Sequence, residues 1–90
     1  MTIERIELLI LRILNDAPQH QFTTAQIHAD VNGSSDELVT KNEITRALEN
    51  LEEKTPRQVI RVTGTERSQG LLTTITSAGI VRVLQAPSEK

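Results

Sequence analysis

The sequence contains no cysteine and only one aromatic residue, Phe22. The lack of cysteine excludes a disulfide framework and thiolate chemistry, since both require cysteine sulfur. The near-absence of aromatics argues against RNA-recognition and single-strand-binding domains, which stack bases on aromatic side chains. These absences narrow the classes of nucleic-acid binder to those that do not depend on base stacking.

Long apolar runs are also lacking. The longest one is short and is interrupted by Arg12, so no segment is predicted to cross a membrane. The start of the chain lacks the basic flank and small-residue cleavage site of a signal peptide. The sequence therefore predicts a cytoplasmic protein without membrane attachment.

The chain has 90 residues, of which 37% are hydrophobic. This is enough for one small domain and leaves no room for a second core. We expect a single domain over residues 1–86, with 87–90 as a flexible tail. Domains of this size are marginally stable and often gain stability by association.

Charge is distributed unevenly, although the net charge is only −2. Residues 1–39 hold two basic and six acidic residues, a net −4, whereas residues 40–82 hold seven basic and five acidic residues, a net +2. A surface that binds a phosphate backbone is therefore expected in the second half of the chain.

The segment TIERIELLILRILNDAP predicts a first helix, because its apolar residues recur at helical spacing until Pro18 stops the backbone ladder. Leu8 and Leu11 make the apolar stripe wider than one core face requires. Two interpretations remain open. The helix is either packed on both sides within the domain, or it presents a partner surface, most simply a homodimer interface.

A short second helix is predicted from QFTTAQIHADVNG, after a very short extended segment at Gln21–Phe22. Thr23 and Gln26 have the spacing of a capping box, in which two side chains satisfy free amides at a helix start. Asn32–Gly33 is expected to close the helix with a left-handed residue. The polar loop GSSDELV follows.

The segment VTKNEITRALENLEEK, with its helix at residues 40–54, is the best-formed helix signal. Thr40 and Glu43 form a second capping box, and Val39 and Ile44 form a hydrophobic staple. Its apolar stripe is narrow: Ile44, Ala47, Leu48 and Leu51. The opposite side carries Asn42, Arg46, Glu49 and Glu53, flanked by Thr45 and Asn50.

After residue 54 the apolar residues no longer follow helical spacing. The β-branched residues in VIRV and TTIT predict two strands of a hairpin around the polar tip GTERSQG. The segment TSAGIVRVLQ returns to helical spacing. The expected class is mainly α with a minor β part (α+β): a three-helix core, a two-stranded hairpin and a short C-terminal helix.

Enzyme and metal chemistry are not indicated. His20 and His28 match no zinc-ligand spacing and are expected to be solvent-exposed. The serines have no identifiable base partner, and GTERSQG lacks the lysine and hydroxyl residues of a phosphate-binding loop. We therefore predict no catalytic activity, no cofactor and no metal.

The element order resembles that of winged helix-turn-helix domains. FTTAQIHADVNG corresponds to the first helix of the motif, TKNEITRALENLEEK to the recognition helix, and VIRVTGTERSQGLLTTIT to the wing. ITSAGIVRVL, with Thr76 and Gly79, is similar to the segment after the wing in many bacterial regulators of this superfamily. The resemblance implies a homodimeric transcriptional regulator that binds double-stranded DNA.

In such domains the recognition helix enters the major groove and the wing tip, here residues 64–70, reaches the minor groove or backbone. The resemblance assigns base contacts to the exposed side of helix 40–54 and phosphate or minor-groove contacts to the helix start and hairpin. The implied DNA-binding residues are Lys41, Asn42, Thr45, Arg46, Arg61, Arg67, Ser68 and Gln69. The implied dimer interface comprises Ile3, Leu8, Leu11, Val81 and Leu84.

The glutamates of helix 40–54 do not fit this pattern well. Glu43 is explained by capping, but Glu49 faces a base, a phosphate or neither, and near a phosphate it is repelled. The alternative function is a winged-helix protein-interaction module, an inhibitor or subunit of a nucleic-acid-processing complex, which takes a protein partner and does not itself bind DNA.

Overall fold

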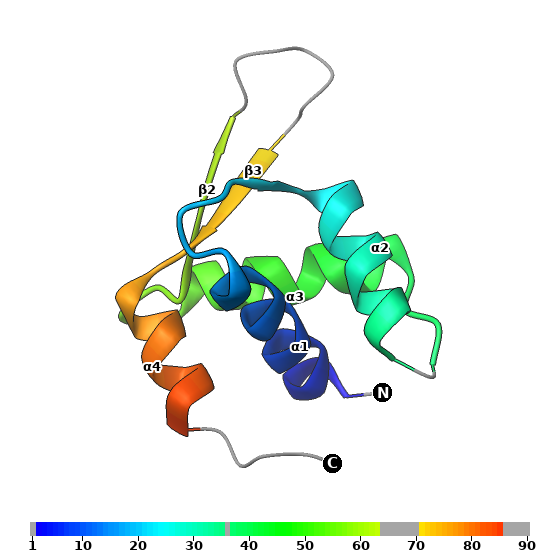
Figure 1. Ribbon diagram of the computed structural model, residues 1–90, viewed down its shortest axis with the longest axis horizontal. Coiled ribbons are helices and arrows are strands. Elements are labelled where there is room, and N and C mark those ends of the chain that lie inside the picture. Colours follow the sequence, from blue (N-terminus) through cyan, green and yellow to red (C-terminus); the bar gives the residue numbers. More distant parts are fainter. Residues whose placement is uncertain (1, 36, 64–70, 86–90) are drawn as a thin grey trace.

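A computed structural model describes residues 2–35, 37–63 and 71–85. Along the chain it contains α1 (Ile3–Asp16), β1 (Phe22–Thr23), α2 (Thr24–Ser34), α3 (Lys41–Glu53), β2 (Val59–Thr63), β3 (Leu71–Ile75) and α4 (Ser77–Gln85). Over these ranges the protein is a mixed α+β domain of four helices and one three-stranded antiparallel sheet. The helices α1, α2 and α3 pack together, the hairpin projects from them, and α4 lies beside α1 (Figure 1).

The helix starts follow from local sequence. Thr2, Thr23 and Thr40 all have extended backbone and accept a hydrogen bond from an amide in the first turn of the following helix. The amides of Thr23 and Thr40 also donate to the side-chain oxygens of Gln26 and Glu43, which confirms both predicted capping boxes. Each box satisfies amides that have no partner within the helix.

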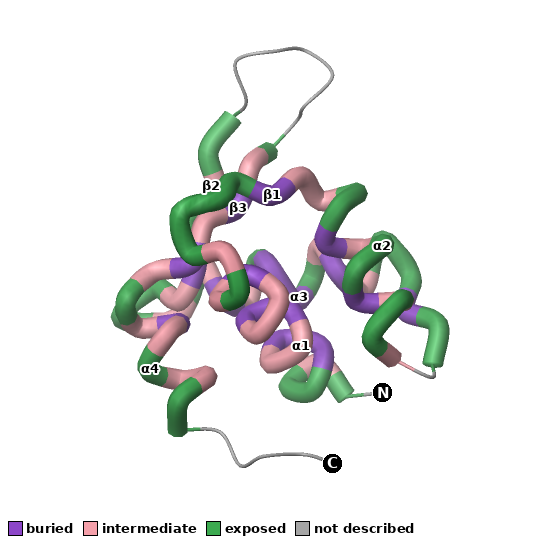
Figure 2. The backbone as a smooth tube through the Cα atoms, in the orientation of Figure 1, coloured by how far each residue is buried: buried purple, intermediate pink, exposed green. Residues whose placement is uncertain are grey.

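The core lies where α1, α2 and α3 meet, and buried residues concentrate there in Figure 2. Ile6, Ile10 and Leu14 of α1 are fully or almost fully buried. They pack in one cluster with the apolar stripe of α3 and with Ile27 and Val31 of α2. Val39 and Ile44 are both buried in this cluster, as expected for the two residues of a hydrophobic staple.

The sheet corrects two expectations. It has a third strand, because Phe22 pairs with Thr73 and Thr23 with Leu72, giving the order β1-β3-β2. The expected extended segment was Gln21–Phe22, one residue earlier. A two-residue strand carries no periodic signal, and its position depends on the partner strand. The hairpin alone is therefore not the whole sheet.

Gly33 provides another correction. It lies inside α2, which continues to Ser34, and its backbone is not left-handed. Asn32, the other residue expected to close this helix, instead uses its side chain on Val39. The helix therefore ends at Ser34, without the left-handed residue that the sequence suggested.

One ionic cluster joins three parts of the chain. Glu7 of α1 is 3% exposed, and its Oε1 accepts a 2.8 Å hydrogen bond from Nη1 of Arg82 in α4. Arg82 Nη1 also donates to Gln58 Oε1 at 2.8 Å, just before β2. Lys54 Nζ, just after α3, lies 3.6 Å from the same Glu7 oxygen. One oxygen of the buried carboxylate therefore has two cationic partners, one from α4 and one from the end of α3.

Gly79 allows α4 to dock closely. A Cβ atom added there would lie 2.3 Å from the backbone oxygen of Gln58 and 2.8 Å from Cγ1 of Ile75. The same Gln58 oxygen accepts a hydrogen bond from the Thr76 amide. The absence of a side chain at residue 79 thus permits the close contact between α4 and the segment that enters β2.

We expect Gly79→Ala to lower the free energy of unfolding by about 2 kcal/mol, because a backbone atom must move to admit the methyl group. Gly33→Ala is the matched control: nothing lies within 4 Å of a Cβ at that helical position. It should raise stability by roughly 0.5 kcal/mol. Urea unfolding followed by circular dichroism measures both, and effects of the same sign would contradict the packing described here.

Arg82→Met should lower the free energy of unfolding by about 3 kcal/mol, since it leaves the buried Glu7 carboxylate with only the longer contact to Lys54. Glu7→Met combined with Arg82→Met should recover much of that loss, because no buried charge then lacks a partner. The same unfolding assay tests this, and strictly additive costs would show that the two side chains are not coupled.

Candidate nucleic-acid interface

The start of α3 is held by interactions on both sides of Thr40. Glu43 Oε1 accepts hydrogen bonds from the Thr40 amide and hydroxyl, each at 3.1 Å. The Thr40 hydroxyl oxygen in turn accepts from the Glu43 amide at 3.2 Å. The bonds from the Thr40 amide and hydroxyl lower the pKa of Glu43. This glutamate is therefore occupied in capping.

A second set of contacts fixes the residue before the cap. The Val39 amide donates to Asn32 Oδ1 at 2.6 Å, and the Val39 carbonyl accepts from Asn32 Nδ2 at 3.1 Å. His28 Nε2 lies 2.8 Å from the same carbonyl, which can only accept, so Nε2 carries the proton. The 3.1 Å approach of Asn32 Nδ2 to His28 Nε2 is then a contact between two donors.

His28 is half-buried in this arrangement and is not the solvent-exposed histidine that the sequence suggested. We name His28, Asn32 and Val39 the α2–α3 clasp. Its sequence signal is weak: a histidine and an asparagine one helical turn apart, ahead of a loop. The clasp sets where α3 begins relative to α2.

The N-terminal half of α3 presents three of the predicted contact residues to solvent: Lys41, Asn42 and Arg46 are exposed. Thr45 is half-buried, and its hydroxyl donates to the Lys41 carbonyl at 3.0 Å. The hydroxyl proton is therefore used within the helix, and towards a ligand the Thr45 hydroxyl can act only as a hydrogen-bond acceptor. Asn42, Thr45 and Arg46 fall within one arc of about 100° around α3, and Lys41 lies at the helix start.

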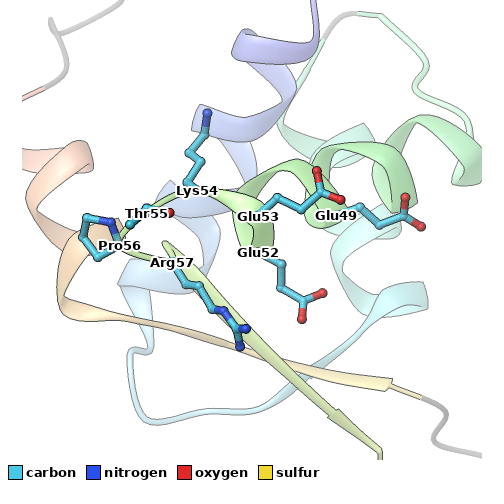
Figure 3. A pocket seen from close by; sticks show the side chains of 7 residues that line it. All are labelled: Glu49, Glu52, Glu53, Lys54, Thr55, Pro56 and Arg57. Carbon is cyan, nitrogen blue, oxygen red and sulfur yellow. The ribbon is translucent and has the colours of Figure 1, made fainter.

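The C-terminal half of α3 is acidic and borders a hollow of about 560 Å³. Glu49, Glu52 and Glu53 extend from the helix, and Arg57 extends from the segment before β2 (Figure 3). Glu49 therefore lies beside two other carboxylates and lines the hollow with them. The hollow is also lined by Lys54 and Arg57, but the helix itself contributes three carboxylates there, which disfavours backbone phosphate contacts along this half of α3.

Arg61 is placed differently from the prediction. Its side chain is only 8% exposed, and its Nη1 lies 3.4 Å from Oε1 of Glu52. Strand alternation is the reason: residue 61 shares the inner side of β2 with the buried Val59. Among the described residues, the Arg61 Nε atom and the opposite Thr73 hydroxyl are buried with no hydrogen-bond partner. Arg61 therefore does not offer its charge to a phosphate backbone in this conformation.

The remaining predicted DNA contacts, Arg67, Ser68 and Gln69 in the wing tip 64–70, lie outside the described residues, as does the predicted tail 87–90. Beside that tip, Ile60 and Val62 of β2 are 47% and 43% exposed. They point away from the core, so the outer side of β2 carries two exposed apolar side chains.

The predicted dimer residues fall into three groups. Val81 and Leu84 are exposed on α4, whereas Ile3 and Leu8 on α1 are half-buried. Leu11 has no exposed surface, because it packs in the core and against α4 beside Gly79. Leu11 is therefore removed from the candidate surface, and its apolar character is explained by packing within the domain.

Histidine and carboxylate groups give no alternative site. His20 is exposed, and its ring packs edge-on against Phe22 with centroids 4.6 Å apart. Over the part of the chain that the structure describes, no three His, Asp or Glu side chains are grouped so as to hold a metal ion. In the same part, no helix has the length and apolar character needed to cross a membrane.

The lowered pKa of Glu43 predicts a pH dependence of stability. The advantage of the wild type over Glu43→Gln should be complete above the ordinary range of glutamate pKa values. It should be lost as pH falls from that range through the lowered native pKa, because the folded state must then take up the proton. Urea midpoints at a series of pH values measure this.

Thr40→Ala provides the matched variant, since it removes the hydroxyl bond to Glu43 and keeps the backbone amide bond. In that background the pH-dependent advantage of Glu43 over glutamine should be smaller. A difference between wild type and Glu43→Gln that stays constant with pH would contradict the capping role of the carboxylate.

Comparisons with protein-family models, with curated proteins and with solved structures give no match for this chain.

Proposed function

We propose that this protein is a small winged-helix DNA-binding protein, a homodimeric transcriptional regulator that acts in the cytoplasm. The proposal places the N-terminal half of α3 in the major groove and the wing tip 64–70 on the minor groove or backbone. The observation that carries it is the exposed set Lys41, Asn42 and Arg46 at the start of a helix fixed by the Thr40 cap and the α2–α3 clasp.

The order of elements supports this proposal. The helices α1, α2 and α3 precede the β2–β3 hairpin, and the short strand β1 between α1 and α2 joins the same sheet. A winged helix-turn-helix domain has this order, with α2 and α3 as its helix-turn-helix pair. The hairpin follows α3 directly, so a wing and a recognition helix would lie on neighbouring parts of the surface.

The exposed side chains suit base readout. An arginine such as Arg46 can donate two hydrogen bonds to guanine, and an asparagine such as Asn42 can pair with the adenine edge. Lys41, at the first position of the helix, suits a phosphate. With Arg61 engaged by Glu52, few cations remain for the backbone, so affinity should depend strongly on low salt and on the doubled contacts of a dimer.

Glu49, Glu52 and Glu53 limit how the helix can dock. Their carboxylates lie together at the C-terminal end, around the hollow in Figure 3. Because they repel phosphate, we infer that DNA contacts only the first half of α3. In this arrangement Glu49 lies where the DNA-contacting N-terminal half of α3 meets its acidic C-terminal half, and it contacts neither a base nor a phosphate.

Fluorescence anisotropy with a labelled random-sequence duplex at low salt tests the proposal. The wild type should bind, and Arg46→Ala should weaken binding about tenfold, within the range for loss of one base-reading arginine. Arg57→Ala is the matched control, since it removes one exposed positive charge at the acidic end of α3. It should leave affinity nearly unchanged.

Equal losses for Arg46→Ala and Arg57→Ala would show that only overall charge matters and that the groove assignment is wrong. Absence of binding with the wild type at micromolar protein would reject DNA binding altogether.

The second candidate function is a protein-interaction module that inhibits or joins a nucleic-acid-processing complex. The three glutamates of α3 beside the hollow and the exposed Ile60 and Val62 favour it, because together they offer a basic partner both charge and apolar surface. In the anisotropy assay this function predicts no binding of duplex by any variant.

A further inference from the structure

Strand β2 lies at one edge of the sheet. In the order β1-β3-β2 it pairs with β3 on one side, and among the strands of the described ranges none pairs with it on the other. Figure 1 shows the hairpin of β2 and β3 projecting from the helices. An edge strand carries backbone amides and carbonyls without a partner in the sheet, so it can pair with a strand from another molecule.

The register determines which backbone groups of β2 face this open edge. The Thr76 amide donates to the Gln58 carbonyl at 3.1 Å, directly before the first pair of the ladder. Hydrogen-bonded and non-hydrogen-bonded pairs alternate along antiparallel strands. Ile60 and Val62 therefore bond to β3 through their backbones. The residues whose amides and carbonyls point to the open edge are Val59, Arg61 and Thr63.

The two faces of β2 differ in their side chains. Ile60 and Val62 are exposed on the outer face. On the inner face Val59 is buried, and Arg61 is paired with Glu52 of α3. The side chains of a strand that pairs with β2 alternate in the same way. On the outer face they would contact Ile60 and Val62, and on the inner face they would point towards α3.

Charges beside the inner face favour a basic side chain. The charged residues that line the neighbouring hollow are Glu49, Glu52, Glu53, Lys54 and Arg57. Lys54 lies 3.6 Å from Glu7, and Glu52 is paired with Arg61. The other three make no ion pair within the described part of the chain, and two of them are the carboxylates that extend from α3 in Figure 3. The charge left over is therefore negative, and it lies on the helix that the inward side chains would face.

We propose that the open edge of β2 binds an extended peptide segment in which apolar and basic residues alternate. The segment adds a strand to the sheet, and its backbone bonds to the outward amides and carbonyls of Val59, Arg61 and Thr63. Its apolar side chains lie on Ile60 and Val62. Its basic side chains point inwards, to the glutamates of α3.

This binding mode deepens the second candidate function, on which it rests, because it describes how a basic protein partner is held. It does not depend on DNA binding. The proposed DNA contacts on α3 lie in the N-terminal half of that helix, whereas the segment would face the C-terminal half. Peptide binding and DNA binding are therefore measured separately.

Amide hydrogen exchange, followed residue by residue by NMR, tests the edge. In the free protein the amides of Ile60 and Val62 should exchange slowly, because they bond to β3, and those of Arg61 and Thr63 should exchange fast. The probe is a short peptide in which valine alternates with lysine. At saturation it should slow exchange at Arg61 and Thr63 at least about tenfold.

Fluorescence anisotropy of the labelled peptide measures its affinity. Thr63→Pro removes one outward amide without removing a bond to β3, and it should weaken binding about tenfold. Thr63→Ala keeps that amide, so it is the matched control and should bind nearly as the wild type does. Circular dichroism confirms that both variants are folded.

Two control peptides are measured on the wild type alone, so they do not depend on the folding of a variant. One has the same composition with its valines and lysines in separate blocks, and the other alternates valine with glutamate. Each should bind at least about tenfold more weakly, the first because its side chains do not match the two faces and the second because it faces the carboxylates of α3.

A wild type that does not bind the alternating lysine peptide at millimolar concentration overturns the inference. So does equal binding of either control peptide, or binding that leaves exchange at Arg61 and Thr63 unchanged. A second copy of the chain on this edge would slow the same exchange without peptide, and that result also overturns it. None of these measurements uses DNA, so failure here leaves the DNA-binding proposal standing, and absence of DNA binding leaves the peptide site standing.

Discussion

The buried carboxylate of Glu7 is the constraint on which the placement of the last third of the chain depends. A charge that is 3% exposed must be partnered, and its partners come from α4, through Arg82, and from the end of α3, through Lys54. Arg82 also holds Gln58, and the Gln58 backbone oxygen contacts the residues that open α4. One carboxylate on α1 thus fixes both where α4 lies and where β2 begins.

The position of the hairpin relative to α3 follows from this arrangement. Between the end of α3 and the start of β2, the chain is held by the Gln58 amide bonded to the Leu51 carbonyl and by the Arg82 contact. Further along, the Glu52–Arg61 pair joins the same two elements. If α3 and the wing act on DNA together, their relative geometry depends on these contacts, including that of Arg82 in α4, which does not belong to the proposed interface.

The parts of the fold that sequence could predict are those decided within a few residues. The capping boxes at Thr23 and Thr40 and the apolar stripe of α3 are local signals, and all are present. The misplaced features depend on distant partners. The short strand β1 exists because β3 lies beside it, and α2 runs past Gly33 to Ser34 while the Asn32 side chain bonds to Val39. Arg61 follows the same rule, since only the pairing of β2 with β3 determines which side chains of the strand point inwards.

For the candidate site, the exposure of Lys41, Asn42 and Arg46 was predictable from the helical period. The ion pair of Arg61 with Glu52 was not predictable, because it depends on how the strand packs against α3.

The α2–α3 clasp has a consequence for how this domain can vary. Because Asn32 and His28 bind the backbone of Val39 directly, the distance between the two helices is set without the intervening loop. The length of the loop after Ser34 therefore does not determine the spacing of α2 and α3. Residues could be inserted or deleted there while α3 kept its place, so the segment can diverge in length and charge independently of the helix it precedes. In this small domain, the segment that can change most in length therefore lies next to α3, the proposed recognition helix.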